Sequence, residues 1–328
     1  MTIDPQLKPF IEKLDQLWPE PTLSLSVDAW RGRIEELSRA ARVPYPETLS
    51  VEDHVLAAGA RRFRVRVYRP QADSTLPALL YMHGGGWVVG SIESHDAITS
   101  GLATDTPCVV ISVDYSRAPE HPFPAAVEDC QAALVWAFDN AAQLGIDPQT
   151  IFVGGDSAGG NLAAAMTLSF RRGPRRICGQ LLLYPCVDVD FSRASYISEA
   201  RAPYLKAAEM IWFWEQYCPQ AELRRNPLAV PFIEQSLAGL PPAFVVVAEH
   251  DPLHDEGRDY VNKLSTAGVP ATYRPGKGLI HGFLRTRGIC DAAQAEHIAM
   301  TAWMRSVAEA VHAGRLAASA TTESQRVR

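Results

Sequence analysis

The sequence predicts an α/β protein with a mostly parallel central sheet flanked by helices, and three observations support this. Six short apolar segments, rich in β-branched and aliphatic residues and bounded by Gly, Pro or Asp, are typical of strands buried on both faces. Longer helical patterns alternate with these segments, as in α/β architectures. The chain has 328 residues, of which 47% are hydrophobic and 21% charged, so it can bury a substantial core.

The predicted elements begin with a helical N-terminal region. Residues 51–70 then alternate apolar and polar side chains around Gly59, which predicts an antiparallel hairpin at the edge of the sheet. The predicted buried strands are 76–83, 107–115, 150–155, 179–188, 243–251 and 271–278, and the predicted helices between and after them are 124–144, 158–171, 255–267 and 291–312.

Two regions do not fit the alternation of strands and helices. Residues 1–45 precede the first strand, and residues 190–228 interrupt the series with three adjacent aromatics, more than one helix face can bury. Because α/β sites lie at the carboxyl edge of the sheet, we expect both regions to form a helical cap over that edge. The catalytic domain would then comprise 46–189 and 229–315, followed by a flexible tail at 316–328.

Charge and composition bear on partners and location. The net charge is −6 and no run of Lys and Arg stands out, so we expect no nucleic-acid partner. The N-terminal sequence lacks the pattern of a signal peptide, and no apolar run reaches the length of about 18 residues that suggests a membrane span. The six cysteines are scattered without a CxxC, which favours free thiols in the cytoplasm. Neither HExxH nor other metal-ligand spacing occurs, so we expect no metal.

The sequence GDSAG at 155–159 matches G-x-S-x-G, with an apolar strand before it and a helix after it. Such a turn lifts the serine hydroxyl into the open, the glycines leave room for neighbouring chain, and the helix N-terminus favours negative charge. A phosphate-binding loop is not supported, because neither G-x-G-x-x-G nor G-x-x-x-x-G-K-[ST] occurs. We therefore predict that Ser157 is a nucleophile. The role of Asp156 stays open between support of the site and capping of the helix.

A second glycine-rich segment, HGGGW at 83–87, follows an apolar strand. Three successive glycines let the backbone approach a ligand closely and turn its N–H groups inward. Loops of this type complete the oxyanion hole of a serine hydrolase together with the N–H that follows the nucleophile. We predict the donors to be Gly85, Gly86 and Ala158, and we expect His83 to be structural.

The acid and the base are expected in the chain order Ser, Asp or Glu, His. Asp251 follows an apolar strand and precedes Pro252, which fixes a turn at the carboxyl edge of the sheet. His281 lies further downstream, in a loop and beside a glycine. We predict Asp251 as the acid and His281 as the base. His250 and His254 flank Asp251 and are the nearest competitors.

Four ordered motifs resemble those of the bacterial hormone-sensitive-lipase-like esterases (family IV) of the α/β-hydrolase superfamily: HGGGW, GDSAGGN at 155–161, DPLHDEG at 251–257 and HGF at 281–283. The resemblance covers roughly residues 45–315. It implies an α/β-hydrolase fold with a helical cap, a Ser157–Asp251–His281 triad, no cofactor, and a tendency to form homodimers. His254 stands where the family usually has Arg, so its role stays open.

The predicted function is a carboxylesterase that hydrolyses short- to medium-chain acyl esters through an acyl-enzyme intermediate, as the resemblance implies. Its partner would be a small-molecule ester, in a pocket that we expect to be shaped by the aromatic residues Trp87, Tyr184, Trp212, Phe213 and Trp214. Hydrolysis of amides, carbamates or lactones by the same triad is an alternative. A ligand receptor without activity on this fold is a third possibility, which the presence of His281 argues against.

Overall fold

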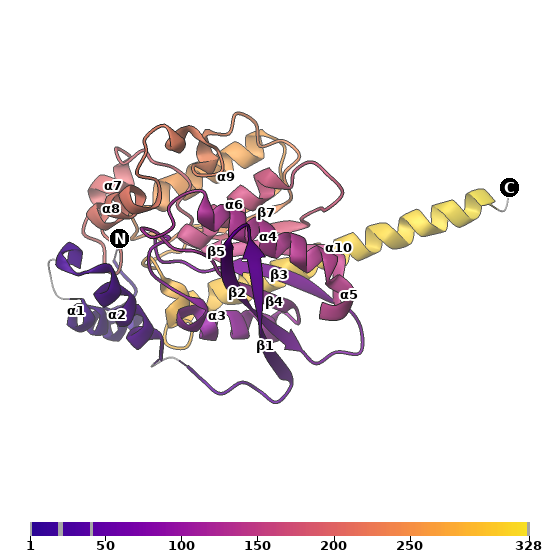
Figure 1. Ribbon diagram of the computed structural model, residues 1–328, viewed down its shortest axis with the longest axis horizontal. Helices are drawn as coiled ribbons and strands as arrows, with labels where there is room; N and C mark the ends of the chain where they lie inside the picture. The colour runs from indigo at the N-terminus through magenta and orange to yellow at the C-terminus, as the bar shows by residue number, and fades with distance from the viewer. Residues whose placement is uncertain (1, 19–21, 40–41, 327–328) are drawn as a thin grey trace.

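The computed structural model describes residues 2–18, 22–39 and 42–326, with side chains as far as residue 314 (Figure 1). Within them the chain forms one eight-stranded sheet in the order β1-β2-β4-β3-β5-β6-β7-β8. The strands are β1 Leu49–Ala58, β2 Arg61–Pro70, β3 Leu76–Met82, β4 Val109–Asp114, β5 Ile146–Asp156, β6 Gly179–Leu183, β7 Ala243–Val246 and β8 Ala271–Arg274. The pairs β1–β2 and β2–β4 are antiparallel and the other pairs are parallel. The predicted mostly parallel sheet is therefore confirmed.

The edge hairpin also forms as predicted. Strands β1 and β2 pair from Leu49 with Pro70 to Ala58 with Arg61. The turn between them contains Gly59, whose φ of 59° lies in the left-handed region that glycine adopts without strain.

Both faces of the central strands β3 to β7 are buried under helices, as the continuous apolar strands predicted. Along β3 the side chains alternate, with Leu80 in one apolar cluster and Leu79 and Tyr81 in the other. The first cluster packs under α4 Ala125–Asp139, α6 Ala158–Ser169 and α9 His254–Thr266, and the second under α3 Ile92–Asp105 and α10 Asp291–Arg326. The short helix α5 Ala141–Leu144 precedes β5. The segment 316–328, predicted to be a tail, continues α10 as far as Arg326, and its side chains lie outside the described residues.

Helix α3 was not among the predicted helices. It begins at a capping box, in which the Ser91 hydroxyl accepts the Ser94 N–H and the Ser94 hydroxyl accepts the Ser91 N–H. Most of its residues are buried, including the polar residues His95, Asp96 and Thr99. A helix buried on nearly every side shows no apolar stripe, so periodicity does not reveal it.

The two regions predicted as a cap lie together in the fold (Figure 1). The N-terminal region contains η1 Pro5–Leu7, α1 Lys8–Leu17, η2 Thr22–Ser24 and α2 Val27–Arg39, and the second region contains α7 Ala194–Ser198, α8 Ala207–Tyr217 and η3 Leu223–Arg225. The Trp30 ring of α2 stacks on Trp212 of α8 at 5.2 Å between centroids, and the Thr22 hydroxyl donates to the carboxylate of Glu209. These contacts join two segments that are far apart in the sequence.

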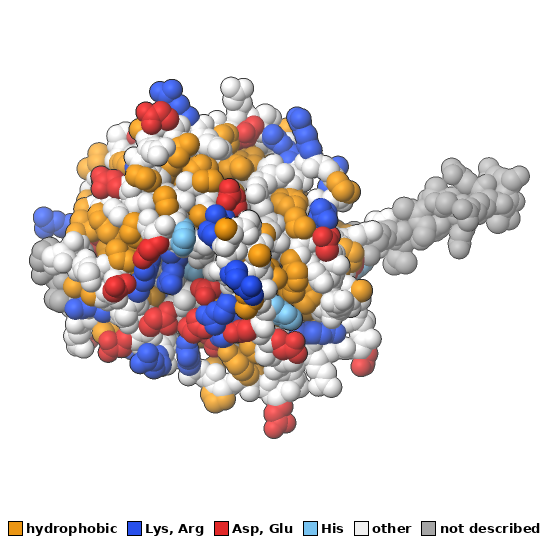
Figure 2. Space-filling model, in the orientation of Figure 1, with side chains coloured by type: hydrophobic (Ala, Val, Ile, Leu, Met, Phe, Trp, Pro, Cys, Tyr) orange, Lys and Arg blue, Asp and Glu red, His pale blue; other side chains and the backbone are white. Residues whose placement is uncertain are grey.

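Basic and acidic side chains are interspersed on the surface that includes β2 (Figure 2). Arg64 pairs with Glu93 and Asp114, and Arg66 pairs with Asp53 at 2.6 Å. The cationic side chains of Arg64 and Arg66 are therefore matched by neighbouring carboxylates. In the part of the chain that the structure describes, no helix has both the length and the apolar character needed to cross a membrane.

Candidate active site

Ser157 occupies the sharp turn between β5 and α6. Its φ of 56° and ψ of −118° are strained for a residue with a β-carbon, and its N–H donates to the Leu183 carbonyl at 2.8 Å. The two glycines around it touch the neighbouring strand β3. A β-carbon would lie 2.3 Å from the Met82 carbonyl oxygen if added to Gly155, and 1.9 Å if added to Gly159. The predicted function of these glycines, to make room for neighbouring chain, agrees with this geometry.

The structure brings Ser157, His281 and Asp251 together in one hydrogen-bonded series. His281 Nε2 lies 2.9 Å from Ser157 Oγ, and His281 Nδ1 lies 2.7 Å from Asp251 Oδ2. The other carboxylate oxygen, Asp251 Oδ1, accepts the Leu253 N–H at 2.9 Å. Asp251 is fully buried and His281 is 3% exposed, so little water competes for these hydrogen bonds.

The loops that carry the acid and the histidine are held in register by their neighbours in sequence. His250 forms an isolated parallel bridge with Ile280, and its N–H donates to the Leu279 carbonyl at 2.9 Å. Residue 251 is therefore fixed opposite residue 281. The Tyr184 ring packs 4.7 Å from the His281 ring, between centroids, and limits how far the imidazole can tilt.

The glycine loop 83–87 faces Ser157. Gly85 and Gly86 have φ values of 122° and 57°, and both line a cavity that Ser157 and His281 also line. The Val88 and Val89 N–H groups donate to the Gly85 carbonyl, which turns that carbonyl back into the loop. Within the described residues, neither Gly85 nor Gly86 donates its N–H to a protein group. Ala158 is the first residue of α6, so its N–H has no partner within the helix.

Asp156 does not cap the helix that follows it. Its Oδ1 accepts the Tyr81 hydroxyl at 2.7 Å and the Gly84 N–H at 3.0 Å. Burial disfavours the charged form of this carboxyl, but the nearby His95, the Tyr81 hydroxyl and Arg285 outweigh burial and lower its pKa below the usual value. Asp156 is therefore a buried anion directly beside Ser157, and of its two predicted roles the structure favours support of the site.

The remaining histidines singled out in the sequence lie apart from the Ser157 hydroxyl. His83 is buried and stacks on Tyr115 with 4.3 Å between ring centroids. Burial, and then the proximity of His95, lower the pKa of His83 well below its usual value, so the ring is neutral. His254 Nδ1 lies 3.3 Å from Asp255 Oδ1 at the start of α9, outside the cavity lining.

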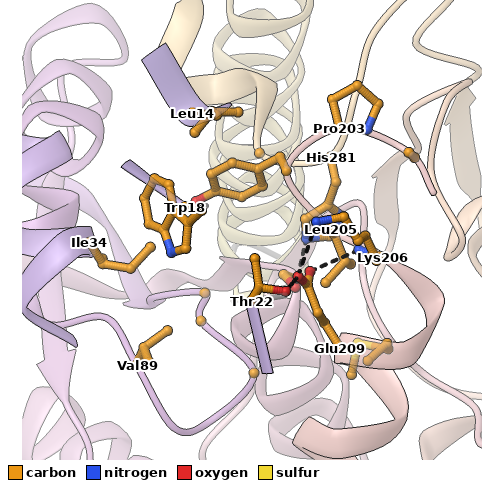
Figure 3. A pocket seen from close by; sticks show the side chains of 18 of the residues that line it. Leu14, Trp18, Thr22, Ile34, Val89, Pro203, Leu205, Lys206, Glu209 and His281 are labelled. Carbon is orange, nitrogen blue, oxygen red and sulfur yellow. Dashed lines mark hydrogen bonds and ion pairs between the residues drawn. The ribbon is translucent and has the colours of Figure 1, made fainter. Parts of the chain in front are cut away.

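A cavity of about 770 Å³ opens above Ser157, and the cap supplies much of its wall (Figure 3). In this view Trp18 and Ile34 lie on one side and Leu205 and Glu209 on the other, with Thr22 between them. The cap residues that line it are Ile11, Leu14, Asp15, Trp18, Thr22, Trp30, Ile34, Arg201, Ala202, Pro203, Tyr204, Leu205, Lys206, Glu209, Met210 and Phe213. Sequence reasoning did not find the lining residues from α1 and α2, because nothing local indicates which residues two distant segments bring together.

The lining differs from the aromatic pocket that the sequence predicted, since only Phe213 of the five aromatics contributes to it. Trp87 is fully buried between Tyr217, which stacks on it at 4.0 Å between centroids, and Trp214. The Tyr184 ring packs against the His281 ring. Trp212 stacks on Trp30 and does not itself line the cavity. Successive residues of α8 point about 100° apart, so its three adjacent aromatics face different surroundings.

Residues 79–285 match the profile of a protein family described by its alpha/beta hydrolase fold. The chain is 37% identical over 296 residues to the carboxylesterase NlhH of Mycobacterium tuberculosis, an alignment that covers 89% of this chain and 92% of the relative. The chain belongs to the hormone-sensitive-lipase-like esterases (family IV) of the α/β-hydrolase superfamily. This family IV member is a carboxylic-ester hydrolase.

Other proteins similar to this family IV esterase are also esterases. An arylesterase of Saccharolobus solfataricus is 35% identical over 291 residues, which are 87% of this chain and 93% of the relative. Among solved structures, a hyperthermophilic esterase from the archaeon Pyrobaculum calidifontis is 38% identical with a TM-score of 0.86, covering 94% of this chain and 99% of that chain. The α/β-hydrolase fold implied by the sequence motifs is thereby confirmed.

In the part of the chain with described side chains, no three His, Cys, Asp or Glu residues are grouped so that they could hold a metal ion. The six cysteines are unpaired, and five of them are buried.

Proposed function

We propose that the protein hydrolyses short- to medium-chain acyl esters through a triad of Ser157, His281 and Asp251. The observation that carries the proposal is the pair of hydrogen bonds, 2.9 Å and 2.7 Å long, that links these three side chains at the floor of a cavity. A nucleophile, a base within hydrogen-bond reach and a carboxylate that orients the base are the parts that acyl transfer requires.

In the proposed reaction His281 Nε2 takes the Ser157 proton while Oγ attacks the ester carbonyl carbon. The carbonyl π electrons move to oxygen, and the N–H groups of Gly85, Gly86 and Ala158 stabilise the resulting oxyanion, each by about 3 kcal/mol. The tetrahedral intermediate collapses, and the alcohol leaves with the proton from His281. Water then attacks the acyl-enzyme by the same steps, which releases the acid and restores Ser157. Asp251 holds the tautomer of His281 in which Nδ1 carries the proton.

The size and lining of the cavity support the proposed chain length. Its volume of about 770 Å³ is typical of sites for small molecules, and apolar side chains such as Leu14, Ile34 and Phe213 line it. We expect the best substrates to be p-nitrophenyl esters whose acyl chains have about four to eight carbons, because chains of this length fit a cavity of this size. An optimum at twelve or more carbons would refute the chain-length proposal and leave the triad proposal intact.

The triad is tested with Ser157→Ala and p-nitrophenyl butyrate. We expect kcat to fall by about 10⁴-fold or more, because no other group replaces the nucleophile. Ser169→Ala is the matched control, since Ser169 lies in the same helix α6 and outside the cavity lining. A fluorophosphonate probe should label the wild type and the control but not Ser157→Ala. Wild-type turnover by Ser157→Ala would refute the proposal.

A further inference from the structure

The carboxylate of Asp156 contacts the glycine loop 83–87. Its Oδ1 accepts the N–H of Gly84, the residue directly before the two glycines proposed as oxyanion donors, at 3.0 Å. The contact is close-packed as well as hydrogen-bonded, because a β-carbon on Gly84 would lie 2.5 Å from Asp156 Oδ2. The Tyr81 hydroxyl donates to the same Oδ1 at 2.7 Å, and Asp156 is 5% exposed. The carboxylate is therefore held in one place against the loop.

The negative charge of this carboxylate is balanced by the nearby Arg285 guanidinium, with His95 between them. Asp156 Oδ2 lies 3.4 Å from His95 Nε2, and Arg285 Nη2 lies 3.1 Å from the same nitrogen. Arg285 follows His281 by four residues, and its other donors bind the Ser94 carbonyl at 2.8 Å and the Tyr204 hydroxyl at 3.0 Å. An uncompensated anion beside Ser157 would oppose the developing oxyanion, so the guanidinium removes a cost that the carboxylate would otherwise impose.

The glycine loop is thus anchored at two points, before Gly85 and at the peptide group that carries the Gly86 N–H. Asp156 holds the N–H before Gly85, and the N–H groups of Val88 and Val89 hold the Gly85 carbonyl at 3.0 and 2.9 Å. Donors of an oxyanion hole stabilise the transition state best when they are oriented before the reaction begins. A loop with three successive glycines has the greatest conformational freedom of any backbone, so its orientation must come from such anchors.

We infer that Asp156 is a positioning residue for the proposed oxyanion hole: by accepting the Gly84 N–H, it fixes the directions of the Gly85 and Gly86 N–H groups. This inference rests on the proposed function. It assigns Asp156 no contact with the substrate and no part in proton transfer. It also gives the acidic residue of the GDSAG motif a task different from that of Ser157 beside it.

The inference is tested with Asp156→Ala and Asp156→Asn. The alanine variant removes the acceptor, whereas the amide oxygen of asparagine can still accept the Gly84 N–H. We expect Asp156→Ala to lower kcat for p-nitrophenyl butyrate by about 10- to 100-fold, with KM within about twofold, because the loss falls on the transition state. Asp156→Asn should restore most of that kcat. If it falls as far as alanine, the hydrogen-bond acceptor is not what matters and the inference is wrong.

A trifluoromethyl ketone gives a readout that a merely structural role would not move. Ser157 Oγ adds to its carbonyl carbon, the proton passes to His281, and the ketone oxygen becomes an oxyanion in the proposed hole. Its Ki should rise in Asp156→Ala by the same factor by which kcat falls. Ser169→Ala, in helix α6 and outside the cavity lining, is the control and should leave this Ki unchanged. An unchanged Ki in Asp156→Ala would overturn the inference.

A second variant and a labelling experiment complete the test. If Asp156→Ala does not fold, Gly84→Ala perturbs the same contact from the loop side, because its β-carbon would press on the Asp156 carboxylate, and it should raise the ketone Ki likewise. Fluorophosphonate labelling separates the two levels of the argument. A wild type that is not labelled at Ser157 would refute the proposed function itself. A labelled wild type with equal ketone affinity in the variants would refute only the role of Asp156.

Discussion

Replacement of Gly159 by alanine should destabilise the protein and slow ester hydrolysis, although alanine is the better helix former. Gly159 is the second residue of α6 and packs against the end of β3. An added β-carbon would lie 1.9 Å from the Met82 carbonyl oxygen and 2.6 Å from the Met82 carbonyl carbon. The first of these distances is about 1.5 Å shorter than ordinary van der Waals contact, so the helix or the strand must move.

The expected magnitude follows from two opposing contributions. Alanine in place of glycine inside a helix stabilises by about 1 kcal/mol, and overpacking of a well-packed core costs about 1–3 kcal/mol. Because backbone atoms take most of the clash at Gly159, we expect a net loss of about 1–2 kcal/mol. Met82 directly precedes the glycine loop, and a displacement of about 1 Å near a site can cost about 100-fold in rate. We therefore expect kcat to fall by about 10- to 100-fold.

The assay combines urea unfolding, followed by far-ultraviolet circular dichroism, with the turnover of p-nitrophenyl butyrate. Gly32→Ala is the matched control, because Gly32 lies exposed within α2 and a β-carbon there would meet nothing within 4 Å. The control should keep its activity and gain up to about 1 kcal/mol of helix stability. The steric account of the motif is refuted if Gly159→Ala unfolds at the same or higher urea than the wild type and turns over at the wild-type rate.

Three further predictions concern the cap, pH and the thiols. Thr22→Val removes the hydroxyl that donates to buried Glu209 and joins the two parts of the cap. KM should therefore rise about fivefold, equivalent to about 1 kcal/mol, and an unchanged KM would show that this hydrogen bond does not shape the cavity. Arg31 lowers the pKa of Glu120 from 4.5 to about 2, so this pair adds stability above pH 4.5 that is lost as pH falls toward 2. In Arg31→Met the urea concentration at half-unfolding should depend less on pH over that range. If its pH dependence is the same as in the wild type, the pair does not contribute this stability. Burial raises the pKa of Cys108 to about 12, so Ellman's reagent should react with it only in urea, where all six thiols become accessible.

The parts of the site that depend on local backbone geometry could be predicted from the sequence. Gly155 and Gly159 are required by contacts with the adjacent strand, and a strand–glycine–serine–helix pattern allows few other conformations. Chain order and the position at strand ends were enough to choose Asp251 and His281, and the structure places both within hydrogen-bond distance of their expected neighbours. The surroundings of Asp156 could not be read in the same way, because Tyr81 and His95 contact it from two other segments and Arg285 binds His95 from a third.

The cavity wall could not be predicted, because its residues meet only when the two parts of the cap pack together. Trp30 and Phe213 pack with their ring centroids 5.0 Å apart although they are far apart in the chain. The aromatic run of α8 suggested a substrate pocket, yet Trp214 packs against Trp87 in the core and only Phe213 reaches the cavity. Composition identifies a segment that must bury aromatic surface, but tertiary packing decides which ring faces the cavity.

The groups near Ser157 and the cap side chains, which line the same cavity, should therefore affect catalysis differently. Groups near Ser157 interact with charge that appears only in the transition state, so changes in the Asp156–Gly84 contact should act mainly on kcat. Apolar cap side chains such as Leu14 and Ile34 carry no group that stabilises charge, so we expect their contribution to binding to be the same before and during the reaction. Changes in the cap should act mainly on KM and on which acyl chain is accepted. A new substrate range in this chain should accordingly arise from changes in the cap residues that line the cavity, while the loop and the serine turn stay fixed.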